Sequence, residues 1–189
     1  METVTVINYK RTPFQKNIPL LLALFVFLAD QISKLIILKN IPEPGTLGAD
    51  FGKGFLWIIH ERNNAIAFSL GADLPEIIRI LLFSIIPLGL LTVLINYLVK
   101  SDTFSSPQRW ALSAIIGGGL GNIFDRIFRP KGVIDFISVK FYGIFKLERW
   151  PTFNIADACV VIAAIILIIM LITESVKTIK RKKLYEQES

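Results

Sequence analysis

The run IADACVVIAAIILIIMLIT, residues 155–173, decides the fold class. A helix that crosses the hydrocarbon core of a bilayer needs about 20 mostly apolar residues, and this run carries a single charge near its start. Residues 77–99 form a second such run, in which Pro87 predicts a kink. Residues 18–38 and 110–128 qualify only if polar side chains are accepted inside them. We therefore predict an all-α polytopic membrane protein with four transmembrane helices.

The overall composition agrees with a membrane protein. The chain has 189 residues, of which 53% are hydrophobic and 19% are charged, and this is too apolar for an ordinary soluble domain. Its formal net charge is +6, but the basic residues flank the apolar runs, which favours membrane lipids over nucleic acid as partners. The single cysteine, Cys159, excludes an intramolecular disulfide and a cysteine-based metal site. We expect one membrane domain over residues 1–189.

The basic residues also predict the orientation. They are densest at 177–183, just after the last apolar run, which places both termini in the cytoplasm and segments 39–76 and 129–153 outside. The first outward segment contains FLWII, residues 55–59, which is typical of a short strand. The basic start followed by residues 18–38 resembles a signal peptide. Because no small-x-small cleavage site follows, we expect a retained helix.

Two charged residues fall inside residues 18–38, the first apolar run in the chain, and each needs a partner. A charge at the centre of a bilayer costs about 2.5 to 3.5 kcal/mol on insertion scales. Asp30 and Lys34 are spaced i, i+4, so they can pair with each other or with a neighbouring helix. They form either a structural ion pair or one edge of a site at the outer end of this helix.

Residues 110–128, the third run in the chain, contain GGGLGNIFDR at 117–126. Its glycines at i, i+4 spacing predict close approach of another helix. Asn122, Asp125 and Arg126 follow at i, i+3 and i+4, so an amide, a carboxylate and a guanidinium share one face. We expect Asp125 and Arg126 to pair and to anchor the end of this helix.

Two further acids carry the functional hypothesis. Asp135 is flanked by apolar residues just past the third run, and Asp157 lies one turn after Asn154, which predicts an N-cap. Each acid alone has a structural explanation, such as a favourable contact with a helix dipole. If they meet at the outer ends of adjacent helices, the two acids share one proton near neutral pH. One can then activate water while the other protonates the peptide being cut, as in an aspartate-dependent peptidase.

Other functions receive less support from the sequence. His60 is the only histidine and no HExxH motif exists, so metalloprotease and Ser-His chemistry are disfavoured, and we expect His60 to be an interfacial side chain with no chemical role. A small transporter would spread polar residues through the membrane depth of several helices. A noncatalytic scaffold held together by glycine packing would tolerate Asp→Asn changes at Asp135 and Asp157.

Five short motifs together resemble one known family, the bacterial lipoprotein signal peptidases, also called signal peptidase II. In chain order, they cover Asp30 to Lys34, Asn63 to Phe68, Gly119 to Arg126, Val133 to Phe136, and Phe153 to Asp157. The resemblance extends over nearly the whole chain. Two departures are Ala65 and Ile66, where the family has glycine followed by a small residue or methionine, and a long segment from 137 to 152 that suggests a lid.

This resemblance implies an aspartyl endopeptidase of the bacterial cytoplasmic (inner) membrane, and we expect it to be a monomer. It would remove signal peptides from prolipoproteins, cutting before the diacylglyceryl-modified cysteine, without a metal or cofactor. The fold would add a small extracytoplasmic β-structured platform and a surface helix at about 40–76, with the active site near the outer face. By motif position the catalytic residues would be Asp135 and Asp157, the supporting residues Asn63, Asn122, Arg126 and Asn154, and the bracing residues Asp30, Lys34 and Asp125.

Overall fold

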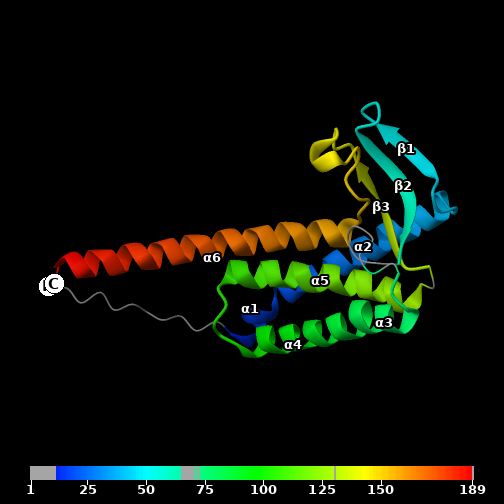
Figure 1. Ribbon diagram of the computed structural model, residues 1–189. Helices are drawn as coiled ribbons and strands as arrows, with labels where there is room; N and C mark the ends of the chain where they lie inside the picture. The colour runs from blue at the N-terminus through cyan, green and yellow to red at the C-terminus, as the bar shows by residue number, and fades with distance from the viewer. Residues whose placement is uncertain (1–11, 65–70, 72, 130, 189) are drawn as a thin grey trace.

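Four long helices and a small sheet make up the part of the chain that the computed structural model describes, residues 12–64, 71, 73–129 and 131–188 (Figure 1). The long helices are α2 (Leu20–Asn40), α4 (Ile86–Lys100), α5 (Ser106–Phe128) and α6 (Ile155–Glu188). They run alongside one another, and the sheet stands at the end of the bundle where α2 ends and α6 begins. The chain is therefore mostly helical, as predicted.

Three helical segments within the described residues are long and apolar enough to cross a membrane, namely Pro13–Asn40, Glu76–Lys100 and Ile155–Leu184. The first of these includes the short helix α1 (Pro13–Asn17). α5 is of similar length, but its glycines and polar residues make it less apolar. The predicted count of four spans is therefore not confirmed, and α5 as a fourth span stays a prediction.

The kink predicted at Pro87 corresponds to a widened helical turn just before that residue. This segment begins as α3 (Glu76–Ile80), passes through the π-helical η2 (Leu81–Ile85) and continues as α4. The N–H of Ile86 donates to the carbonyl of Leu81, five residues back. Because Pro87 has no N–H to give to the preceding turn, a wider turn satisfies the backbone locally.

The sheet consists of β1 (Leu47–Phe51), β2 (Leu56–Asn63) and β3 (Val133–Val139), all antiparallel, in the order β1-β2-β3. The strand predicted at residues 55–59 is confirmed, because it lies almost entirely within β2. The sequence did not identify β3 as a strand. We call the sheet and the loop of residues 140–153, which includes the short 3-10 helix η3 (Ile144–Lys146), the platform.

Apolar packing fixes the platform to the helices. Ile37 and Ile41 near the end of α2 are buried against Ile134 and Phe136 of β3. Successive side chains of a strand point to opposite faces. Asp135, between these two residues, therefore faces away from this apolar contact, so the packing of β3 on α2 sets the direction of its carboxylate.

Glycines in α5 allow α2 and α6 to approach its backbone, as predicted. A Cβ added at Gly117 would lie 2.4 Å from the carbonyl oxygen of Ala23 in α2. A Cβ added at Gly118 would lie 2.6 Å from the carbonyl oxygen of Ala156 in α6. Both distances are far below van der Waals contact, so only glycine fits. The polar residues of α5 are thereby brought within reach of both helices.

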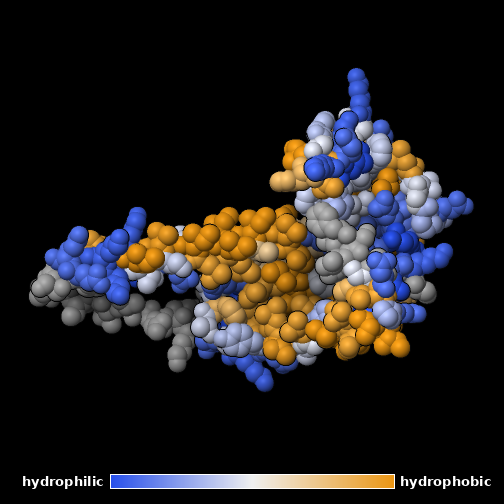
Figure 2. Space-filling model, in the orientation of Figure 1, coloured by the Kyte–Doolittle hydropathy of each residue, from blue (hydrophilic) through white to orange (hydrophobic). Residues whose placement is uncertain are grey.

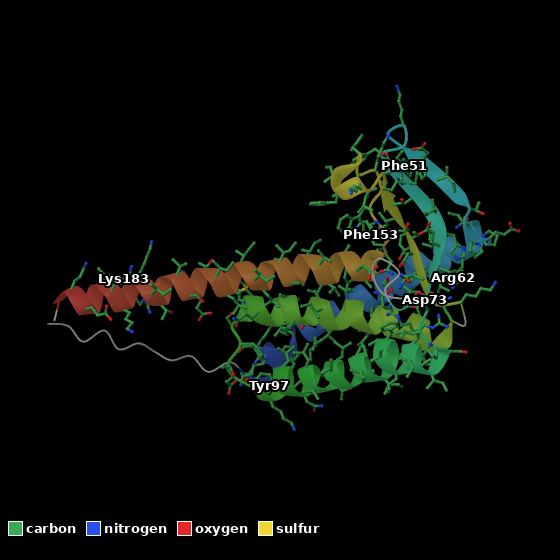
Figure 3. The ribbon with its side chains drawn as sticks, viewed as in Figure 1. Phe51, Arg62, Asp73, Tyr97, Phe153 and Lys183 are labelled. Atoms are coloured by element: carbon green, nitrogen blue, oxygen red, sulfur yellow. The ribbon has the colours of Figure 1, made fainter. Side chains whose placement is uncertain are left out.

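The surface of the helices is apolar over a broad band, whereas the platform and the far end of α6 are polar (Figure 2). Large side chains exposed on these helices include Phe25, Leu90, Ile165 and Ile169. Contiguous apolar surfaces of this extent are rare on soluble monomers and suit a lipid environment. α6 continues beyond the predicted end at residue 173 and carries Lys183 near its far end (Figure 3). Tyr97 lies at the end of α4 that is opposite the platform.

Candidate active site

Asp135 is a buried acid held by two amides. Its side chain is only 2% exposed. Asn63 of β2 donates to its Oδ2 at 3.0 Å, and Asn154, just before α6, donates to its Oδ1 at 2.7 Å. Burial, with a smaller contribution from the neighbouring charge of Asp157, raises the pKa of Asp135 from 3.8 to about 7, although the two amides and Lys34 act in the opposite direction. Asp135 can therefore hold a proton near neutral pH.

Asp157 lies in the first turn of α6 and is fixed by bonds to the helix start. Its N–H donates to Asn154 Oδ1 at 2.9 Å, and its Oδ2 accepts the N–H of Asn154 at 3.2 Å. This reciprocal pair confirms the predicted N-cap at Asn154. The remaining oxygen, Oδ1, accepts a bond from the Nδ2 of Asn122 in α5 at 2.7 Å. Both carboxylate oxygens of Asp157 thus have fixed donors.

Asn154 connects the two acids. It is fully buried, and its side-chain amide donates to Asp135 while its backbone N–H donates to Asp157. The same amide donates to Asn122 Oδ1 at 3.0 Å, and Asn122 in turn donates to Asp157. Two carboxyl groups that are 22 positions apart in the sequence are therefore held by one hydrogen-bonded set of amides.

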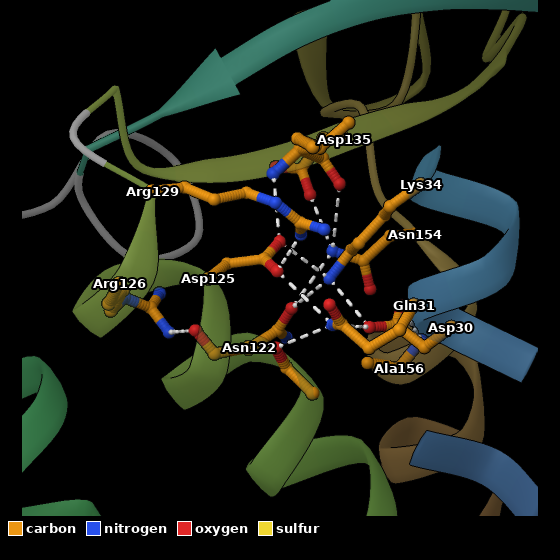
Figure 4. Close-up of polar contacts among 12 residues, drawn as sticks. Asp30, Gln31, Lys34, Asn122, Asp125, Arg126, Arg129, Asp135, Asn154 and Ala156 are labelled. Atoms are coloured by element: carbon orange, nitrogen blue, oxygen red, sulfur yellow. Dashed lines mark hydrogen bonds and ion pairs between the residues drawn. The ribbon is translucent and has the colours of Figure 1, made fainter. Parts of the chain in front are cut away.

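Behind these acids lies a buried ion network (Figure 4). The Nζ of Lys34 lies 2.7 Å from Asp30 Oδ2 and 2.9 Å from Asp125 Oδ2, and all three side chains have no exposed area. Lys34 also donates to Asn122 Oδ1 at 3.0 Å, which links the network to the amides around Asp157. The predicted i, i+4 pair of Asp30 and Lys34 is confirmed. A neighbouring helix contributes as well, because Asp125 belongs to α5.

The network also holds the ends of other elements in place. Asp30 Oδ1 accepts the N–H of Ala156 at 3.1 Å, which fixes the start of α6. Asp125 Oδ2 accepts the N–H of Ile134 at 3.2 Å, which fixes β3 next to Asp135. Gln31 Nε2 lies 3.1 Å from both Asp30 Oδ2 and Asp125 Oδ1. Removing a buried charge of this kind leaves its partners uncompensated, which destabilises strongly.

The expected pairing of Asp125 with Arg126 needs correction. The ion pairs that the structure gives Asp125 go to Lys34 and to Arg129. Consecutive helical residues point about 100° apart, so Asp125 and Arg126 do not face each other. Arg126 lines the cleft described below and interacts electrostatically with Asp157 and Asp135, and less strongly with Asp125. Asn122, one turn earlier, lines the same cleft.

Asp135 and Asp157 open into one cleft with a volume of about 1810 Å³. Its polar part includes Asn63, Asn122 and Arg126. Its apolar walls come from η2, α4 and α6, among them Leu82, Phe83, Leu90, Val160 and Ile162. Platform residues close the other side, including Trp57, Arg149 and Trp150. A polar end that holds two acids therefore continues into an apolar region between helices.

The remaining predicted positions have different outcomes. Asn63, Asn122, Arg126 and Asn154 surround the two acids, and Asp30, Lys34 and Asp125 form the network behind them. His60 is fully buried rather than interfacial, with its Nδ1 2.7 Å from the carbonyl oxygen of Ile41, and it lies outside the cleft lining. Ala65 and Ile66 lie outside the described residues. Within the described residues, there is no group of three or more His, Cys, Asp or Glu side chains that could hold a metal ion.

Three basic residues near the site were not selected from the sequence. Arg129 pairs with Asp125, and its i, i+4 spacing from that acid was a readable signal. Arg62 of β2 lines the cleft and donates to the carbonyl of Gly132 at 3.4 Å. Arg149 stacks on the Trp57 ring, with its guanidinium carbon 3.7 Å from the ring centroid. No short motif marks Arg62 or Arg149, because their partners are distant in the chain.

The chain is similar to known proteins over most of its length. Residues 22–173 match the family model described as signal peptidase (SPase) II. The lipoprotein signal peptidase of Treponema pallidum (strain Nichols) is 44% identical over 167 residues, which cover 87% of this chain and 89% of the relative. That of Borrelia duttonii (strain Ly) is 41% identical over 162 residues, covering 86% and 92%. A bacterial membrane enzyme solved by the in meso method is 30% identical, with a TM-score of 0.69 and coverage of 83% of this chain and 88% of that one.

Proposed function

Because the chain belongs to the signal peptidase II family, and is thus a bacterial membrane protease that removes signal peptides from prolipoproteins, we propose that Asp135 and Asp157 carry out the cleavage. In this proposal it is an aspartic endopeptidase that cuts before a diacylglyceryl-modified cysteine. The observation that carries the proposal is the shared amide set, in which Asn154 donates to both acids at one end of an open cleft.

The two acids divide the chemistry between them. Asp157 in its ionised form takes a proton from a water molecule as the water oxygen attacks the carbonyl carbon of the scissile peptide bond. Asp135 in its protonated form donates to the carbonyl oxygen as negative charge develops there. In the second step a proton passes to the departing amine nitrogen and the C–N bond breaks. The products are the released signal peptide and a new amino terminus, with one water consumed.

The pKa of Asp135 supports a proton held near this acid. Burial, and to a smaller extent the charge of Asp157, raise that pKa to about 7, so Asp135 can carry a proton near neutral pH while Asp157 acts as the base. The apparent pKa values of two interacting carboxyl groups belong to the pair.

The shape of the cleft suits a lipidated substrate. The acyl chains of a modified cysteine can remain in the apolar region between α4 and α6, where Leu90 and Ile162 line the wall. The scissile bond then rises to the polar end beside Asp157. Binding of the acyl chains positions the peptide without separate contacts to its sequence, which reduces the entropic cost of reaching the transition state.

The proposed membrane arrangement has four spans, and α5 is the span whose residues are less apolar than those of the other three. α5 contacts α2 and α6 closely through Gly117 and Gly118, so its polar residues need not face lipid. The density of basic residues after α6 supports cytoplasmic termini, and the platform and cleft then face outward. The enzyme acts as a monomer in this proposal, since both acids come from one chain.

The test is cleavage of a diacylglyceryl-modified prolipoprotein by purified enzyme in lipid or detergent. Asp135→Asn and Asp157→Asn should each lower kcat by about 10²-fold or more, because general acid–base groups contribute about that much. Asp50→Asn, an exposed carboxylate in β1, is the matched control and should keep full turnover. Near-normal turnover by either site variant, with its melting temperature preserved, would remove that acid from the mechanism and favour a scaffold.

A further inference from the structure

The loop between β3 and α6 carries an exposed apolar tip. Tyr142, Ile144 and Phe145 are 65%, 52% and 83% exposed, and they lie within four consecutive positions. Exposed large side chains that cluster in this way mark an interaction surface more often than a solvated loop. We call residues 142–146 the loop tip. Nothing in the proposed peptide chemistry requires apolar side chains here.

The backbone of the loop tip is closed on itself. Phe141 N donates to Glu148 O at 2.8 Å, Gly143 N to Leu147 O at 2.9 Å, and Ile144 N to Phe141 O at 3.0 Å. A loop that enters an apolar medium must satisfy its polar backbone groups internally. Phe145 has a φ of 53°, in the left-handed region that is uncommon for a residue with a side chain.

The base of the loop is attached firmly to the sheet. Arg149 donates from Nε to Ser138 Oγ at 2.7 Å and from Nη1 to the carbonyl of Gly54 at 2.8 Å. Its guanidinium also lies on the ring of Trp57. Ser138 belongs to β3, the strand that carries Asp135. The position of the loop tip is therefore rigidly related to the position of the candidate active site.

The loop tip lies beside the first turns of α6, one of the helices that are apolar enough to cross a membrane. Figure 1 shows η3 level with the first turns of α6 along the axis of that helix, instead of beyond its start. Figure 2 shows apolar atoms on the side of the platform that faces along the apolar surface of α6. The Nζ of Lys140 is 5.2 Å from the centroid of the Tyr142 ring, and the exposed Lys146 completes the tip. Aromatic rings beside lysines are typical of the boundary between lipid headgroups and acyl chains.

We propose that the loop tip inserts into the headgroup–acyl boundary of the bilayer, with phospholipid as its partner. Phe145 and Ile144 enter the acyl region, and Lys140 and Lys146 contact headgroup phosphates. Because Arg149 ties the loop to β3, this contact holds the candidate active site at a fixed height over the membrane. The proposal depends on membrane embedding alone and is independent of which residues cut the peptide.

Photocrosslinking of the full-length protein in lipid nanodiscs tests this contact. Phe145→benzoylphenylalanine should give covalent phospholipid adducts on irradiation, detected by mass spectrometry of the intact protein. Lys53→benzoylphenylalanine is the matched control, because Lys53 also has a φ of 53° and lies at the β1–β2 turn, far from the helices in Figure 1. We expect several-fold more lipid adduct at 145 than at 53.

Two outcomes would overturn the proposal. One is an equal yield of lipid adducts at the two positions, and the other is crosslinking of position 145 to added prolipoprotein in preference to lipid. If the variant at 145 does not keep the wild-type melting temperature, Tyr142→benzoylphenylalanine provides a second probe of the same surface, with the same expected excess over the control.

Discussion

Replacing Asp135 by asparagine should change how the stability of the protein depends on pH. Burial and the charge of Asp157 raise the pKa of this carboxyl group from 3.8 to about 7. The folded state then binds the proton more tightly than the unfolded state does, so the free energy of unfolding falls as pH rises from about 4 to about 7. One pKa unit corresponds to about 1.4 kcal/mol. The wild type should therefore lose about 4 kcal/mol relative to Asp135→Asn over this interval.

The assay is chemical unfolding in mixed micelles at a series of pH values, followed for the wild type, Asp135→Asn and the exposed control Asp50→Asn. The free energy of unfolding of the wild type minus that of Asp135→Asn should decrease as pH rises, whereas the same difference between the wild type and the control should stay constant. Comparing how these differences change with pH removes any constant energetic cost of the new amide beside Asn63 and Asn154. A difference that does not vary with pH would refute the buried, proton-holding state of Asp135.

Three other perturbations follow from the same geometry. Asn63→Ala removes a bond that lowers the pKa of Asp135, so the fall of kcat/KM on the alkaline side should move to higher pH in a pH–rate profile. Gly121→Ala places a Cβ 2.5 Å from Asp30 Oδ2 and should lower the free energy of unfolding by about 1 to 3 kcal/mol, measured by unfolding in micelles. Lys34→Met leaves the buried carboxylate of Asp30 without its cation and Asp125 with Arg129 alone, and should cost about 3 to 5 kcal/mol in the same assay, with loss of turnover.

Matched controls separate these effects from general damage. Gly89→Ala, also in a long helix, meets no atom within 4 Å and should leave stability unchanged. Lys182→Met removes an exposed cation of α6 and should change stability by less than about 1 kcal/mol. If Gly121→Ala or Lys34→Met were as mild as its control, the buried network would not have the role described for it. An unshifted pH–rate profile for Asn63→Ala would show that its bond does not tune Asp135.

The parts of the site that were predictable from the sequence are those with local spacing. The pair of Asp30 and Lys34 follows from i, i+4 geometry, and the cap at Asn154 follows from its position before an apolar helix. Close approach to α5 followed from its glycines. In each case one helix determines the geometry, so the neighbouring residues in the chain carry enough information.

The unpredicted parts depend on contacts between distant segments. β3 pairs with β2, about seventy to eighty positions earlier, and most residues of Val133–Val139 are buried on both faces, so no alternating pattern marks it as a strand. The contact of Asp125 with Lys34 was not predicted because Lys34 is on another helix. The composition of α5 does not mark it as a span, because its glycines and polar residues suit close contact with α2 and α6.

The order in which the chain is made has a consequence for when it can act. Asp30 emerges early, but one of its oxygens holds the N–H of Ala156, and the amide that bridges the two acids belongs to Asn154. A nascent chain that has not yet extended past residue 150 lacks Asp157 altogether. With Asp135 and Asp157 as the proposed catalytic pair, a partly made copy that has not reached residue 157 therefore cannot cut neighbouring chains at the site of insertion.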